Sequence, residues 1–294
     1  MRESRIERPP GDVLLVWALL GAFALAVLVT YSRLPTSELY HVSERGLAGG
    51  AGRMIVYLNF PVALVAVGVV GALLERGARP LPAWVGIALC AVTPFVVDQD
   101  DLDFKPSNAL PALGVLIAIA LTIKARPQHT LAPRRQLDPL RVIAAAAILV
   151  LSVPWFFAEL GFYAPDPILA DEVPAGEVLR AVHAGHHHGT DGMLLTLSAL
   201  LLSRLARSWP LRAYVALMFV YGAANALQDA WNEQLVKRGT TDVEIPSVLL
   251  PNVSLAWGVL VAAAAILFAL SLLRPEGSTS SRASAGAADA SGRT

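Results

Sequence analysis

Five residues between positions 183 and 191 are of the types that bind transition metals, namely His183, His186, His187, His188 and Asp191. Neutral imidazole nitrogens and carboxylate oxygens together suit zinc, iron, manganese or copper. If a helix begins early in this segment, positions 183, 187 and 191 are spaced four residues apart and share one face. The spacing therefore predicts a metal site at the start of a helix, with a divalent transition metal as the cofactor.

The helix that must carry this group follows at once, because residues 193–202 form a largely apolar run of ten. A helix needs about 20 residues to cross a membrane, so this one must extend beyond the run and draw Asp191 to the membrane boundary. Ionisable groups there are costly unless they find partners inside the bundle, and they mark a functional site. Gly189 and Gly192 weaken a helix, which leaves open a solvated loop that binds metal only adventitiously.

Two further carboxylates are candidates for general acid–base chemistry beside such a metal. Glu159 ends an apolar block, and Asp229 belongs to a polar stripe with Asn225, Gln228 and Asn232 at helical spacing. A carboxylate near a bound metal can take a proton from an attacking water, so we expect Glu159 and Asp229 to be catalytic. The alternative for the stripe is interhelical hydrogen bonding that only holds the bundle together.

The composition places these residues in a membrane protein. The chain of 294 residues is 55% hydrophobic and 16% charged, and its apolar residues are gathered into blocks. Its formal net charge of zero gives no support to a nucleic-acid partner. The lipid bilayer is the partner that the composition implies, and protein partners stay undefined. Arginine far exceeds lysine, which is typical of a GC-rich bacterial genome, so we expect a bacterial inner membrane.

The apolar blocks predict an all-α transmembrane bundle of about eight helices. Before the bundle lies a short segment, residues 1–12, and after it lies a tail rich in Ser, Ala and Gly, residues 274–294, which is expected to be disordered. Asn59 and Pro61 predict a kinked second span with an interhelical hydrogen bond. The expected spans are residues 13–31, 54–74, 81–97, 109–123, 142–160, 192–206, 211–227 and 253–273.

Basic residues in the short loops set the expected orientation. The N-terminal segment, the loops 75–80, 124–141 and 204–212 and the start of the tail at Arg274 hold most of the arginines and fall on one side of an eight-helix bundle, so both termini are predicted to be cytoplasmic. The same topology gathers Glu159, the histidine segment and the end of the seventh span on the outer side. The acidic run 98–103 joins them there, but it lacks the pattern of a calcium loop and is expected to be a solvated rim.

One-sided polarity favours a metal-dependent enzyme that acts on a lipid or small amphiphile at the outer face, or a metal-binding assembly factor, over a permease. A permease is the alternative, although it needs a polar route through the bundle and the cytoplasmic halves of the spans have few polar residues. A membrane assembly or metal-handling factor without catalysis is the third hypothesis, with its long loops as the interaction surface. The HxxHH pattern at 183–187 is similar to one box of the membrane desaturases, but those enzymes need several boxes on the cytoplasmic side, which excludes that family.

Overall fold

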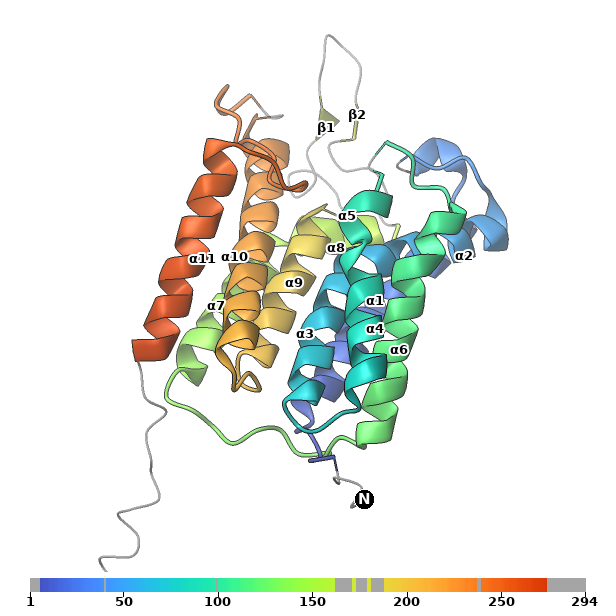
Figure 1. Cartoon of the computed structure of the whole chain (residues 1–294). Coiled ribbons are helices and arrows are strands. Elements are labelled where there is room, and N and C mark those ends of the chain that lie inside the picture. Colours follow the sequence, from blue (N-terminus) through green and yellow to red (C-terminus); the bar gives the residue numbers. More distant parts are fainter. Residues whose placement is uncertain are drawn as a thin grey trace, which may run out of the picture.

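The computed structural model describes residues 6–39, 41–98, 100–161, 171–172, 179–180, 188–236 and 239–273. Within these ranges the protein is a bundle of helices that run side by side (Figure 1). The strands found there are β1 (Asp171–Glu172) and β2 (Leu179–Arg180), which form one short antiparallel pair. The predicted helical fold class is therefore confirmed for the described part of the chain.

The helices follow the predicted apolar blocks in order. In the first half they are α1 (Asp12–Arg33), η1 (Thr36–Glu38), α2 (Gly46–Tyr57), η2 (Leu58–Val62), α3 (Ala63–Leu74), α4 (Pro80–Ala91), α5 (Thr93–Val96), η3 (Pro106–Asn108) and α6 (Ala109–Ala125). In the second half they are α7 (Asp138–Leu151), α8 (Val153–Glu159), α9 (His188–Leu202), α10 (Trp209–Trp231), η4 (Asn232–Val236) and α11 (Leu255–Leu273).

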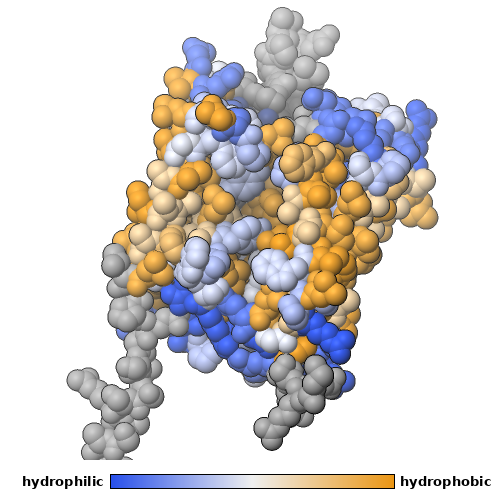
Figure 2. Space-filling view, in the orientation of Figure 1, coloured by the Kyte–Doolittle hydropathy of each residue, from blue (hydrophilic) through white to orange (hydrophobic). Residues whose placement is uncertain are grey.

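Four stretches of helix are long and apolar enough to cross a membrane, namely Asp12–Arg33, Gly46–Leu74, Pro106–Ala125 and Leu255–Leu272. The consecutive helices α7 and α8, bent by 58°, form a fifth candidate. Figure 2 shows hydrophobic residues across the middle of one face and hydrophilic residues at both ends. The protein thus has four to five candidate spans, while the count of eight, the cytoplasmic termini and the disordered tail stay predictions; residues 274–294 lie outside the described ranges.

The second span begins at Gly46 and not at the predicted Met54, because the glycine-rich segment packs directly against α1. A Cβ atom on Gly50 would lie 2.6 Å from the carbonyl oxygen of Leu28. Glycine is a poor helix former, so the sequence pattern argued for a loop. Close packing of one backbone on another stabilises the helix there and makes the segment part of the bundle.

The predicted kink at Pro61 and the predicted partner of Asn59 are both present. Phe60 has an extended backbone with φ −151° and ψ 124°, which breaks the helix between α2 and α3. The Nδ2 of Asn59 donates to the backbone oxygen of Asn108 at 2.9 Å, and the Nδ2 of Asn108 donates to Asn59 Oδ1 at 2.7 Å. Thr93 donates its hydroxyl to the Asn59 carbonyl at 2.9 Å. These bonds satisfy the polar groups that the break exposes inside the bundle.

α9 and α10 cross at a pair of glycines. A Cβ atom on Gly192 would lie 2.6 Å from the carbonyl oxygen of Gly222, and one on Gly222 would lie 2.7 Å from the carbonyl oxygen of Gly192. No larger residue allows two helix backbones to approach so closely. The crossing holds the first turn of α9, which contains Asp191, against the C-terminal half of α10.

Charged contacts between segments far apart in sequence tie the other end of the bundle together. Asp12, which is fully buried, accepts a hydrogen bond from the backbone N–H of Ala132 at 2.7 Å and lies 3.2 Å from Arg204. Glu7 accepts a hydrogen bond from Arg207 at 2.7 Å across a separation of 200 residues. The start of α1 is therefore held by the loop after α6 and by the turn between α9 and α10.

Candidate functional site

Three of the predicted site carboxylates come together at one end of the bundle. Glu159 is the last residue of α8, Asp191 lies in the first turn of α9, and Asp229 lies near the end of α10. All three are buried, and Asp191 is within electrostatic range of both Glu159 and Asp229. We call Glu159, Asp191 and Asp229 the acidic cluster.

Arg53 of α2 brings a positive charge to the acidic cluster. Its side chain is buried, with the guanidinium carbon 5.4 Å from the centroid of the Tyr31 ring, and its charge acts on both Glu159 and Asp191. Sequence reasoning missed this residue because it placed Arg53 in the loop before the second span. The extension of that helix back to Gly46 turns Arg53 into an interior residue.

Asp191 is buried beside more acidic than basic side chains. In the part of the chain that the structure describes, the charges that act on Asp191 are two carboxylates and one guanidinium. Its Oδ1 atom is buried and makes no hydrogen bond to any described residue. A buried carboxylate oxygen without a partner is costly. This oxygen is therefore available to a hydrogen-bond donor or to a bound cation.

The glycines at the start of α9 position the cluster. A Cβ atom on Gly189 would lie 2.4 Å from the Trp155 ring, so only glycine lets α9 pack on α8 at this point. The hydroxyl of Thr30 donates to the backbone oxygen of Glu159 at 2.6 Å and ties the end of α8 to α1. The expected weakening of this helix by glycine is thus offset by close contacts on two sides.

The histidines of the predicted metal site are only partly described. His188 is the first residue of α9 and is half-buried. His183, His186 and His187 lie outside the described residues, so the helical face predicted for His183, His187 and Asp191 stays a prediction. Among the described residues, no group of three or more His, Cys, Asp or Glu side chains is arranged to hold a metal ion.

The polar stripe that runs from the end of α10 into η4 divides into two sets. Asn225, Asp229 and Glu233 follow one another at intervals of four residues and are buried, so they extend the acidic cluster along one face. Asn232 instead holds the following loop, because its Nδ2 donates to the Ile245 carbonyl at 3.1 Å and its Oδ1 accepts from the Ile245 N–H at 3.0 Å. Asn232 therefore bonds a loop and not another helix, and both interpretations of the stripe stay predictions for its buried face.

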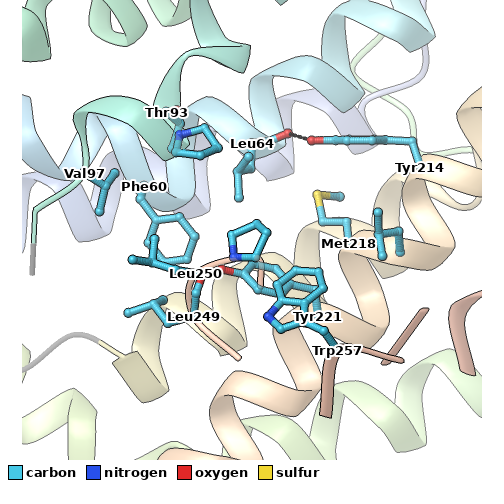
Figure 3. A pocket seen from close by; sticks show the side chains of 13 residues that line it. Phe60, Leu64, Thr93, Val97, Tyr214, Met218, Tyr221, Leu249, Leu250 and Trp257 are labelled. Atoms are coloured by element: carbon cyan, nitrogen blue, oxygen red, sulfur yellow. Dashed lines mark hydrogen bonds between the residues drawn. The ribbon is translucent and has the colours of Figure 1, made fainter. Parts of the chain in front are cut away.

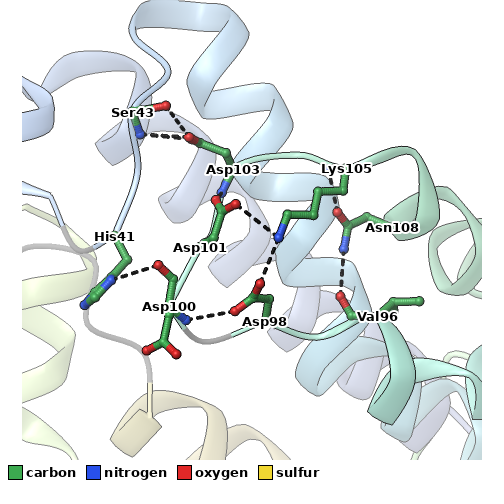
Figure 4. A network of polar contacts seen from close by, with 9 residues as sticks. All are labelled: His41, Ser43, Val96, Asp98, Asp100, Asp101, Asp103, Lys105 and Asn108. Carbon is green, nitrogen blue, oxygen red and sulfur yellow. Dashed lines mark hydrogen bonds and ion pairs between the residues drawn. The ribbon is translucent and has the colours of Figure 1, made fainter.

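The acidic run at 98–103 forms a network of its own (Figure 4). The Nζ of Lys105 lies 2.8 Å from Asp98 and 3.0 Å from Asp101. The carboxylate of Asp103 accepts a hydrogen bond from the Ser43 backbone N–H at 3.0 Å. These contacts make the run a partly neutralised loop that is bonded to the segment before α2.

Acidification is expected to loosen this loop. The hydrogen bond from Lys105 lowers the pKa of Asp98 below its usual 3.8, and the same contact raises the pKa of Lys105 above its usual 10.5. The stability that ionised Asp98 gives to the loop is fully present above pH 3.8 and is lost as the pH falls through the lowered pKa of Asp98. The stability that protonated Lys105 gives to the loop is fully present below pH 10.5 and is lost as the pH rises through the raised pKa of Lys105.

Amide hydrogen exchange of residues 100–108 is the measurement. After correction for the intrinsic exchange rate, protection should stay level between about pH 5 and 9 and should fall below about pH 4. Lys105→Gln should reduce protection across the whole range, since it removes both contacts at once. Equal protection in the wild type and in this variant would contradict the ion-pair account of the loop.

No family model, no curated protein and no solved structure matches this chain. The function is therefore inferred from the geometry and charge of the acidic cluster.

Proposed function

We propose that this protein is an integral membrane enzyme that binds a divalent transition metal at the acidic cluster and acts on a lipid or small amphiphile. The metal is zinc, iron, manganese or copper, the ions that imidazole and carboxylate ligands suit. The observation that carries the proposal is the environment of Asp191, whose buried Oδ1 makes no hydrogen bond to the described residues and which lies within electrostatic range of Glu159, Asp229 and Arg53. A divalent cation at this position would offset the excess negative charge.

The ligands in this proposal are Asp191 and the preceding histidines. His183, His186, His187 and His188 lead directly into the first turn of α9, so their imidazoles are only a few residues away from Asp191 along the chain. Since the described residues alone provide no group of three ligands, the metal site depends on this segment. The bound metal would polarise a carbonyl or phosphoryl group, and Glu159 or Asp229 would take the proton from the attacking water.

The interior beyond the acidic cluster supports a one-sided site over a permease. On α9, Met193, Leu194, Leu195 and Leu202 follow Asp191 toward the other end of the bundle and have no exposed surface. A permeation path needs polar groups along its length to replace the hydration of an ion or solute. The side chains that α9 buries beyond Asp191 are mostly apolar, with Thr196 and Ser198 as the buried polar ones, so reactants are expected to enter and leave from the end that holds the cluster.

Elemental analysis of the purified, untagged full-length protein tests the proposal. We expect about one metal ion per chain in the wild type, loss of the metal when His183, His186, His187 and His188 are replaced by Ala, and at least about tenfold weaker binding in Asp191→Asn. Asp98→Asn is the matched control, because that carboxylate lies in the loop network and should leave the metal content unchanged.

Three outcomes separate the hypotheses. Metal-free protein from metal-replete cells would overturn the proposal, and metal retained in the histidine and Asp191 variants would move the metal site elsewhere. Bound metal without turnover of any lipid ester or phosphate ester would favour a metal-handling or assembly factor. Turnover that disappears in Glu159→Gln while the metal stays bound would support the enzyme and the assignment of its base.

A further inference from the structure

An apolar pocket of about 160 Å³ lies between η2, α5, α10 and α11 (Figure 3). Phe60, Leu64, Met218 and Trp257 are among its walls. A cavity of about 150 Å³ lined by apolar side chains is large enough to hold benzene, so this pocket has room for about six carbon atoms. Its size suits part of a hydrocarbon chain.

The two tyrosines of the pocket use their hydroxyl groups in hydrogen bonds to the backbone. The hydroxyl of Tyr214 donates to the Leu64 carbonyl at 2.6 Å, and that of Tyr221 donates to the Leu249 carbonyl at 2.7 Å. The Tyr221 ring packs edge-on against Phe60 with centroids 6.2 Å apart and lies 5.8 Å from the Trp257 ring. The pocket is therefore lined by ring surfaces and aliphatic side chains that offer little to a polar ligand.

The mouth of the pocket lies on the side of the bundle. Pro94, Leu217 and Leu250 line the pocket and are exposed on the surface, and the face drawn in Figure 2 is hollowed between α11 and α4. α11, which lines one side, is a candidate span with few buried residues. An opening on this side of a membrane bundle faces hydrocarbon, so a lipid chain can enter without passing through water.

Tyr221 connects the pocket to the acidic cluster. It immediately precedes Gly222, just as Asp191 immediately precedes Gly192, so the glycine crossing brings these two residues near each other. Tyr221 is within electrostatic range of Asp191, and its side chain also interacts with that of Asn225. One side chain thus lies between the apolar pocket and the buried carboxylates.

We infer that the pocket holds the hydrocarbon chain of an amphiphile whose polar end lies at the acidic cluster. The inference rests on the proposed function and deepens it, because it names the substrate as a lipid or fatty compound with a flexible chain. The two halves of such a molecule match the two adjoining regions, one apolar and open to the bilayer, the other charged and enclosed.

Quenching of Trp257 fluorescence by 11-bromoundecanoic acid tests this inference on the full-length protein in phosphatidylcholine nanodiscs. The bromine at the chain end quenches a nearby indole, and the difference between the wild type and Trp257→Phe isolates the signal from this residue. We expect saturable quenching, with at least about tenfold weaker binding in Met218→Phe, which fills the pocket. Leu217→Phe, which narrows the mouth from an exposed position, is the second variant and should weaken binding in the same direction.

Leu116→Phe is the matched control, because Leu116 lies on the exposed surface of α6 and does not line the pocket. This variant should bind 11-bromoundecanoic acid as tightly as the wild type does. Quenching that never saturates, or that both pocket variants leave unchanged, would overturn the inference. Metal content measured on the same samples keeps the two proposals separate: metal without saturable quenching removes only the chain pocket, and saturable quenching without metal removes only the metal site.

Discussion

Arg53→Met is expected to lower the free energy of unfolding by about 3 kcal/mol. The substitution keeps much of the side-chain volume and removes the guanidinium that acts on Glu159 and Asp191. Two buried carboxylates then lose a favourable interaction that water cannot replace, since both are nearly inaccessible to solvent. The loss of one charge from a buried set is costly because the remaining buried groups lose the interaction with their counterion.

Thermal unfolding in a mild detergent, calibrated by chemical denaturation, would measure this change. Arg134→Met is the control, because Arg134 is exposed and should tolerate the same substitution with almost no loss. Adding Asp191→Asn to Arg53→Met should restore part of the stability, since one buried charge is then removed with its counterion. Similar losses for the Arg53 and Arg134 variants would show that Arg53 does not balance the acidic cluster.

Gly222→Ala is the second substitution with a large expected effect, a loss of about 2–3 kcal/mol. The added Cβ would meet the carbonyl oxygen of Gly192 at 2.7 Å and the backbone nitrogen of Thr196 at 2.8 Å, and backbone atoms inside a helix cannot yield easily. α9 must therefore move away from α10. Metal binding should weaken in parallel, because the same movement separates Asp191 from Asp229.

Two other helical glycines provide controls for Gly222→Ala. Gly21 in α1 and Gly258 in α11 have no neighbouring atom within 4 Å of an added Cβ. Gly21→Ala and Gly258→Ala should leave stability unchanged or raise it by up to about 1 kcal/mol, since alanine is the better helix former. A Gly222→Ala variant as stable as these two would contradict the close crossing of α9 and α10.

Hydropathy predicted most of the helices because most of the apolar blocks are long and bounded by charge or proline. It failed where packing outweighs propensity, as at Gly46–Tyr57, where a glycine-rich stretch is helical because it lies directly against α1. Because the second span was predicted to begin after Arg53, this charged residue was assigned to the preceding loop and not to the interior. Helix starts that depend on close contact with a neighbour leave little trace in a single sequence.

The candidate site was predictable to the extent that topology determines it. Alternating spans place Glu159, Asp191 and Asp229 at the same end of the bundle, and the structure brings them together. The apolar pocket could not be predicted from the sequence, because helices that are hydrophobic on all sides have no periodic pattern that shows which face packs against which neighbour. The division of the α10 stripe also needed coordinates, since Asn225 and Asn232 have similar chemistry but face different surroundings.

The charged contacts at the end of the bundle opposite the acidic cluster have a consequence for biosynthesis. Asp12 is the first residue of α1, yet it bonds to the backbone of Ala132 and forms an ion pair with Arg204. Glu7 likewise bonds to Arg207, which is 200 residues further along the chain. A chain made from its N-terminus must insert α1 long before these partners leave the ribosome. The helix α1 is therefore made early but acquires these contacts only after the turn between α9 and α10 has been made.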